Sequence, residues 1–131
     1  MRPLEALADA ISQFEGWHKD SRSWRNRNPG NLRPVNGQQV QDKEGYRIFS
    51  TMAEGWGALL DDLFAKFSGS HGLTESSTLL DLLNVYAPAG DSNNPNAYTL
   101  FVCGWTGHCL GCIITPKTTL YEFMSGSGAP K

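Results

Sequence analysis

The most regular stretch of the chain is residues 51–67, TMAEGWGALLDDLFAKF. It opens with the capping-box pattern Thr51-x-x-Glu54, whose side chains satisfy free backbone N–H groups at the start of a helix. Its large apolar side chains then recur every three or four residues, the spacing of one helix face. The pattern predicts a helix over residues 52–67 with one buried side.

Further helices are expected on both sides of this stretch. Apolar residues at helical spacing predict a helix over residues 3–15 with Gly16 as its stop, and a leucine-rich helix over 78–85. The pairs Asn94-Pro95 and Thr115-Pro116 are start signals, so we expect two more helices to begin there. The chain is therefore expected to be mainly α, with about five helices.

A long polar loop is predicted over residues 18–44, which lack a sustained period. The turn-forming pair Asn36-Gly37 predicts a short hairpin within it, and Tyr46–Phe49 is a candidate extended segment, so at most a minor β element is expected. A loop this long is usually functional or disordered, and its Trp and Asn residues favour function. Its basic cluster is either a solvated surface or a contact with an anionic or polar polymer: Arg22, Arg25, Arg27 and Arg33.

Composition limits the class of protein. The chain has 131 residues, 40% of them hydrophobic and 18% charged, which fits one globular domain. We expect that domain over residues 1–124, followed by a flexible Gly/Ser tail over 125–131. A net charge of −2 does not favour nucleic acid, and no apolar run suggests a membrane helix or a signal peptide. The expectation is a soluble monomer without a cofactor and without a nucleic-acid or membrane partner.

Glu15 is the first candidate for chemistry. It flanks the apolar face at the end of the first predicted helix and is followed by Gly16 and Trp17. A carboxylic acid kept protonated by burial, an apolar neighbour and a helix C-terminus can protonate the leaving oxygen of a glycosidic bond. Position alone, however, fits an ordinary surface glutamate near a helix end better.

Two amide-rich stretches are candidates for binding. Residues 28–31, Asn-Pro-Gly-Asn, must turn, and the turn either holds Asn31 against a neighbouring helix or only connects two segments. Residues 86–98 combine two tyrosines with several asparagines, and are either a binding loop or a capping loop with core tyrosines. Asparagine amides both donate and accept hydrogen bonds, which suits sugar hydroxyl and N-acetyl groups.

Taken together, five motifs resemble one known family. EGW, RNRNPGNLR, GYRIFSTMAEGWGAL, YAPAGDSNNPNAY and WTG occur in the order found in small phage- and prophage-encoded lysozyme-like proteins. Many of those are described as lytic transglycosylases, which are lyases of the cell wall, or as virion structural proteins. The resemblance covers about residues 5–121.

The resemblance implies a lysozyme-like fold that binds a peptidoglycan glycan strand in a groove. It implies that Glu15 is the general acid, and that the protein is virion-associated or waits in the cytoplasm before release to the cell wall. Asn93 aligns with the family's loop asparagine, with Asn94 as the alternative. The expected substrate-binding residues are Trp17, Asn31, Tyr46, Tyr86, Asn93 and Tyr98.

The reaction itself has alternatives. Hydrolytic glycosidases generally need two carboxylates, and no motif marks a second one among Asp20, Asp42, Glu44, Glu54 and Asp91, of which Asp20 and Glu44 are the best outside candidates. Lytic transglycosylases need only one. The sequence therefore favours a transglycosylase acting on the MurNAc-GlcNAc β-1,4 bond, over a muramidase or a non-catalytic glycan-binding or virion module.

Three cysteines allow a different class of protein. Cys103, Cys109 and Cys112, with His108 among them, contain the residue types of a structural zinc site, though not at a standard spacing. A zinc-binding interaction domain would rest on this cluster alone. A disulfide would leave one thiol free, and small buried side chains are the simplest interpretation.

Overall fold

A computed structural model describes residues 1–87, 93–126 and 129–130. In this part of the chain the structure is a small, mainly α domain, as the sequence predicts. Its helices are α1 (Pro3–Phe14), α2 (Arg22–Arg25), α3 (Met52–Phe67), the 3-10 helix η1 (Ser70–Gly72), α4 (Leu79–Tyr86), α5 (Pro95–Leu110) and α6 (Leu120–Ser125). The short segments β1 (Cys112–Ile113) and β2 (Ala129–Pro130) pair over two residues and form no layer.

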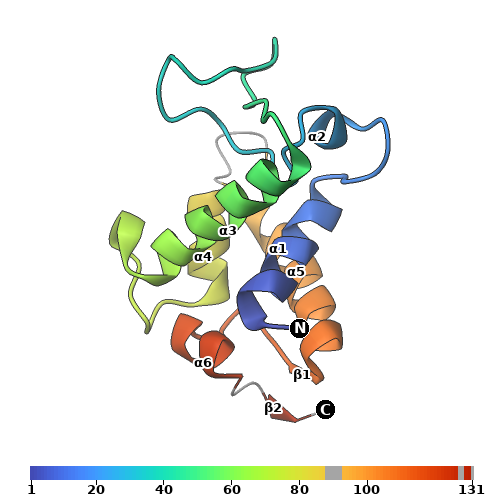
Figure 1. Ribbon diagram of the computed structural model, residues 1–131. Coiled ribbons are helices and arrows are strands. Elements are labelled where there is room, and N and C mark those ends of the chain that lie inside the picture. The colour runs from blue at the N-terminus through green and yellow to red at the C-terminus, as the bar shows by residue number, and fades with distance from the viewer. Residues whose placement is uncertain (88–92, 127–128, 131) are drawn as a thin grey trace.

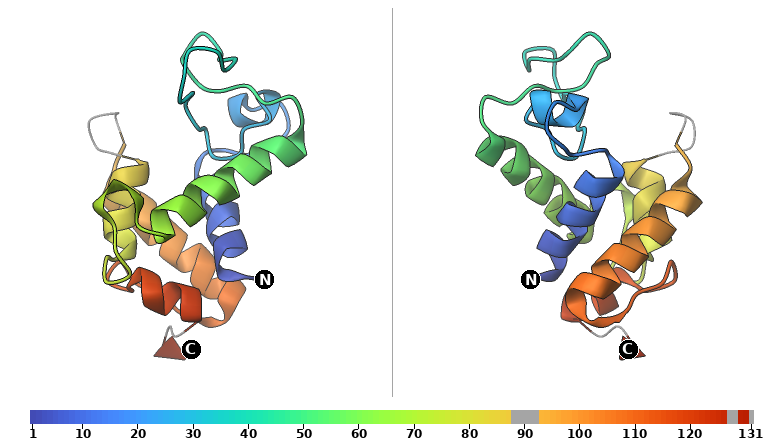
Figure 2. Two further views of the ribbon diagram at one scale, coloured as in Figure 1. Left: turned by 60° about the vertical axis from the view of Figure 1, so that its left-hand side comes forward. Right: turned by 90° about the vertical axis from the view of Figure 1, so that its right-hand side faces the viewer.

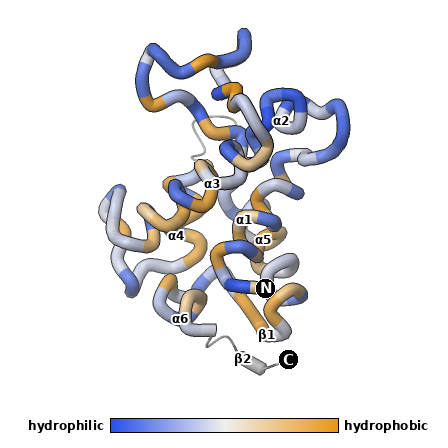
Figure 3. Tube along the Cα trace, viewed as in Figure 1, coloured by the Kyte–Doolittle hydropathy of each residue, from blue (hydrophilic) through white to orange (hydrophobic). Residues whose placement is uncertain are grey.

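The core lies where α1 crosses α5 and α3, with α4 packed on α5 (Figures 1 and 2). Apolar side chains from these helices and from α6 are fully buried there, and each contributes roughly 1.5–3 kcal/mol by leaving water. Figure 3 shows hydrophobic positions concentrated in the helices, while the loop at the upper end is mostly polar. The largest buried members of the core include Leu7, Ile11, Leu59, Leu63, Leu83, Val102 and Phe123.

Four predicted helices are confirmed, but the start of the fifth was wrong. Helix α6 does not begin at Thr115-Pro116, which lead into a turn; it begins at Leu120. Thr119 caps it by accepting a hydrogen bond from the backbone N–H of Glu122, whose side chain accepts in return from the N–H of Thr119. This capping box satisfies two helix-end donors, which a proline start signal alone does not.

The predicted long loop contains more structure than expected. Helix α2 interrupts it, capped by Ser21, which accepts from the backbone N–H of Trp24. The hairpin prediction at Asn36-Gly37 was wrong, because those residues form a separate turn and the pairing joins Gln41 to Arg47. Asp42 explains the shift: its Oδ1 accepts from backbone N–H groups within the turn it begins and so closes that turn.

The cysteines are free thiols. Cys103 on α5 and Cys112 on β1 belong to the core, and burial raises the pKa of Cys103 to about 11. Among the described residues, no three His, Cys, Asp or Glu side chains are grouped to hold a metal ion. The zinc interpretation therefore has no support in this part of the chain.

Two further predictions concern the C-terminal tail and membrane-spanning helices. Ser125, placed in the predicted tail, is the last residue of α6, while residues 127, 128 and 131 lie outside the described residues. The tail therefore stays a prediction. Within the described ranges, every helix falls short of the length and apolarity needed to cross a bilayer.

Candidate active site

A cleft of about 320 Å³ opens between the loop region and the helical body. Its walls come from separate segments: the residue after α1, the turn after α2, the turn between the bridged residues Gln41 and Arg47, one face of α3, the end of α4, and the residue before the cap of α5. The residues that line it are Glu15, Gly30, Asn31, Leu32, Arg33, Tyr46, Asp62, Lys66, Val85, Tyr86, Ala87 and Asn93.

Glu15 lies in this cleft because α1 ends beside it. The helix ends at Phe14, Glu15 is its C-cap residue, and the next residue, Gly16, has a φ of +83° that a side chain would strain. The backbone N–H of Trp17 then returns to the carbonyl of Ser12 at 2.9 Å. This glycine termination stops the helix so that the Glu15 side chain lies at the cleft rather than on the solvent face of the helix.

Both carboxyl oxygens of Glu15 are held. Asn31 donates from Nδ2 to Oε1 at 3.0 Å, and Tyr98 donates from its hydroxyl to Oε2 at 2.8 Å. Tyr98 is fully buried in the first turn of α5, and this burial, with the Glu15 carboxyl group beside it, raises the pKa of Tyr98 far above its ordinary value. The phenol therefore stays a neutral donor, and the carboxyl group has one fixed orientation.

The turn that carries Asn31 is anchored from its interior. Asn28 is fully buried; its Nδ2 donates to the carbonyls of Leu32 and Arg47, and its Oδ1 accepts from the N–H of Leu32, each at 2.9 Å. Tyr86 adds a second anchor by donating its hydroxyl to the carbonyl of Gly30 at 2.7 Å. Sequence reasoning missed Asn28 because its role is to hold the backbone, although the turn signal around it was visible.

Six of the seven predicted site residues meet in or directly under the cleft. Trp17 does not line it, and instead packs edge-on against Trp56 with ring centroids 5.5 Å apart. Between the two aligned asparagines, Asn93 lines the cleft, while Asn94 caps α5 by accepting from the N–H of Ala97. The six are Glu15, Asn31, Tyr46, Tyr86, Asn93 and, beneath the carboxylate, Tyr98.

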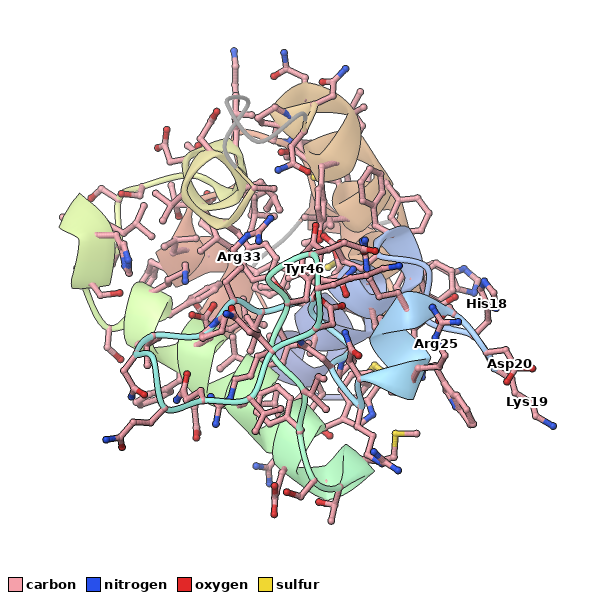
Figure 4. The ribbon with its side chains drawn as sticks, turned by 90° about the horizontal axis from the view of Figure 1, so that it is seen from above. His18, Lys19, Asp20, Arg25, Arg33 and Tyr46 are labelled. Carbon is pink, nitrogen blue, oxygen red and sulfur yellow. The ribbon has the colours of Figure 1, made fainter. Side chains whose placement is uncertain are left out.

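Tyr46 forms the outer wall with two arginines. The guanidinium carbons of Arg22 and Arg33 lie 4.1 and 4.5 Å from its ring centroid, distances typical of cation–π contacts. Arg22 also pairs with Glu44 at 2.7 Å, a hydrogen bond that raises the pKa of Arg22. Of the basic cluster, then, Arg33 lines the cleft and Arg22 supports it, whereas Arg25 is exposed elsewhere (Figure 4).

Of the acids considered as a second carboxylate, the four that the structure describes do not line the cleft. Figure 4 shows Asp20 extending from the edge of the molecule beside Lys19, and Glu44 is occupied by Arg22. Asp91 lies outside the described residues. The cleft instead contains Asp62 of α3, which sequence reasoning missed and which pairs with Lys66 at 2.7 Å.

Asp42 is expected to hold the Tyr46 wall in place. Its Oδ2 accepts from the Asn26 amide at 2.8 Å while its Oδ1 closes the turn. Burial opposes ionisation, but these hydrogen bonds outweigh it and lower the pKa of Asp42. Asp42→Ala should therefore lower the melting temperature at neutral pH, measured by circular dichroism.

The lowered pKa of Asp42 determines how its contribution to stability changes with pH. Because the pKa of Asp42 is lower in the folded state, its contribution is complete above the unfolded value of about 4 and is lost as the pH falls through the folded value. The gap in melting temperature between wild type and Asp42→Ala should narrow below about pH 4. Asp61→Ala, at an exposed position, is the control, and an equal effect of both variants would contradict the role of Asp42.

Tyr98→Phe should slow any reaction that uses Glu15 while leaving the fold intact. It removes only the hydroxyl that donates to Oε2, and the buried ring remains packed against Phe14. A hydrogen bond to a charged group contributes about 1.5–3 kcal/mol, so kcat should fall between about tenfold and a hundredfold. Kinetics and thermal unfolding are measured beside Tyr121→Phe at an exposed position, and an unchanged kcat would contradict the role of Tyr98.

Comparison of the chain with protein-family models, with curated proteins and with solved structures gives no match. Its function therefore has to be argued from the chemistry of the cleft, since a fold by itself does not determine one.

Proposed function

We propose that this protein is a peptidoglycan lytic transglycosylase with a lysozyme-like fold, which cleaves the MurNAc-GlcNAc β-1,4 bond with Glu15 as general acid and then general base. One observation carries the proposal. A carboxyl group at the end of the first helix lines an open cleft and is oriented by two neutral donors, Asn31 and Tyr98.

A single carboxyl group suffices for this reaction. Protonated Glu15 gives its proton to the glycosidic oxygen as the bond from that oxygen to C1 of MurNAc breaks. The resulting carboxylate then takes the proton of the C6 hydroxyl of the same sugar, while that oxygen bonds to C1 and closes a 1,6-anhydro ring. Glu15 ends protonated, as it began, and no water is consumed.

A muramidase is the second candidate, and Asp62 is the observation that favours it. Hydrolysis generally needs a second carboxylate, and Asp62 lines the same cleft as Glu15. Its Oδ2, however, accepts from the ammonium of Lys66 at 2.7 Å, which offsets the negative charge that a catalytic partner would supply. The pairing therefore supports the transglycosylase over the hydrolase.

The product distinguishes these functions. Purified peptidoglycan is digested with the wild-type protein and the soluble muropeptides are identified by mass spectrometry. Products that end in 1,6-anhydro-MurNAc are expected, each lighter by one water than the hydrolysis product. Reducing ends would assign a muramidase, and no release with retained binding to the polymer would assign a non-catalytic glycan-binding module.

A further inference from the structure

The cleft contains a lysine that the reaction above does not use. Lys66 is only 6% exposed, yet it lines the same cleft as Glu15. Its ammonium lies 2.7 Å from Oδ2 of Asp62 and 5.6 Å from the ring centroid of Tyr86. A lysine–aspartate ion pair therefore lines the site, with the Tyr86 ring beside the ammonium.

Packing alone does not call for a charge here. Lys66 is three residues after Leu63 and seven after Leu59, so it continues the apolar stripe of α3. Removing an ammonium from water costs several kcal/mol, and an apolar side chain of similar volume is often as stable or more so. Burying this lysine therefore costs free energy of folding that an apolar residue would not cost, which indicates that its charge has a function.

The ammonium also retains hydrogen-bonding capacity. It has three N–H donors, and Asp62 is its one hydrogen-bond acceptor among the residues that the structure describes. Arg33 adds a second cation to the cleft wall. Lys66 and Arg33 thus place cationic N–H donors in the same cleft as Glu15, and such donors suit a substrate group that carries carboxyl oxygens.

We propose that Lys66 is a specificity-determining residue that recognises the lactyl branch of MurNAc, an inference that rests on the proposed function. The lactyl group is the feature by which MurNAc differs from GlcNAc. Its carboxyl carbon presents an amide carbonyl where a peptide stem is attached and a carboxylate where it is not. An ammonium donates to either, and chitin, built of GlcNAc alone, offers neither at that position.

Binding tests this without catalysis. Isothermal titration calorimetry on the Glu15→Gln protein compares a peptide-free GlcNAc-MurNAc tetrasaccharide with chitotetraose. Adding Lys66→Met should weaken binding of the muramyl ligand roughly ten- to hundredfold, the range of a hydrogen bond to a charged group, and leave chitotetraose unchanged. Lys66→Arg retains the cation and should retain most of the preference.

Controls separate this inference from the proposed function. Lys43→Met removes a charge from an exposed position outside the cleft and should change neither affinity. Equal weakening for both ligands, or no change for either, overturns the role of Lys66 while glycan binding stands. If the Glu15→Gln protein binds neither ligand, the proposed function falls and this inference with it. Thermal unfolding checks that each variant is folded.

Discussion

Glu15→Gln is expected to abolish muropeptide release while leaving the protein folded. Glutamine has nearly the same size but no transferable proton, and general acid–base catalysis contributes about 10²–10⁴ in rate, so kcat should fall on the order of a thousandfold. The amide can still accept from Asn31, and the Tyr98 hydroxyl can turn to accept from the amide nitrogen, so the melting temperature should change little.

The matched control is Glu75→Gln, at an exposed position outside the cleft, which should retain full activity. Full activity of Glu15→Gln would contradict the assignment of the acid. Loss of activity in Asp62→Asn together with reducing-end products would instead assign Asp62 as a second catalytic carboxylate.

Gly55→Ala is expected to have the largest effect on stability. A methyl group at Gly55 would lie 1.8 Å from the carbonyl oxygen of Arg27, so helix α3 and the turn after α2 must separate. Overpacking commonly costs about 1–3 kcal/mol, and a clash with backbone belongs at the upper end of that range. Activity should fall as well, because the displaced turn carries Asn31; urea denaturation and muropeptide release measure the two effects.

Gly57→Ala on the same helix is the control with the opposite sign. Its added methyl group would have nothing within 4 Å, so only the gain in helix propensity remains, about 0.5–1 kcal/mol of added stability. If both variants were destabilised alike, general sensitivity of α3 would explain the result, and the contact at Gly55 would not.

The helices were predictable from sequence because each is a local pattern, whereas Glu15 was singled out as the acid through the resemblance. The stripe of α3 and the glycine after Glu15 depend on neighbours within one or two turns. The contact of Tyr98 with Glu15 is different, since 83 residues separate the two. The resemblance placed Tyr98 among the substrate-binding residues but did not predict this contact, because no local pattern encodes a distance across the fold.

The differences between the expectations and the structure have physical causes as well. Helix α2 has four residues, too few to show the helical spacing of apolar side chains, so the sequence predicted a loop there. Trp17 follows Glu15 in the chain, but the left-handed turn at Gly16 sends it toward Trp56 instead. Asp62 and Lys66 were overlooked because they lie within a helix assigned to the core. The lysine within the apolar stripe of that helix was the signal that could have revealed them.

The backbone of Asn31 has a consequence for which sequences can preserve this site. Its φ of +48° is left-handed, a region that glycine, asparagine and aspartate enter most readily. Glycine there would keep the backbone and lose the donor to Glu15, and aspartate would set a second negative charge against it. Asparagine meets both demands at the least backbone cost, so in a library that carries all twenty amino acids at position 31, selection for activity should return asparagine far more often than any other residue.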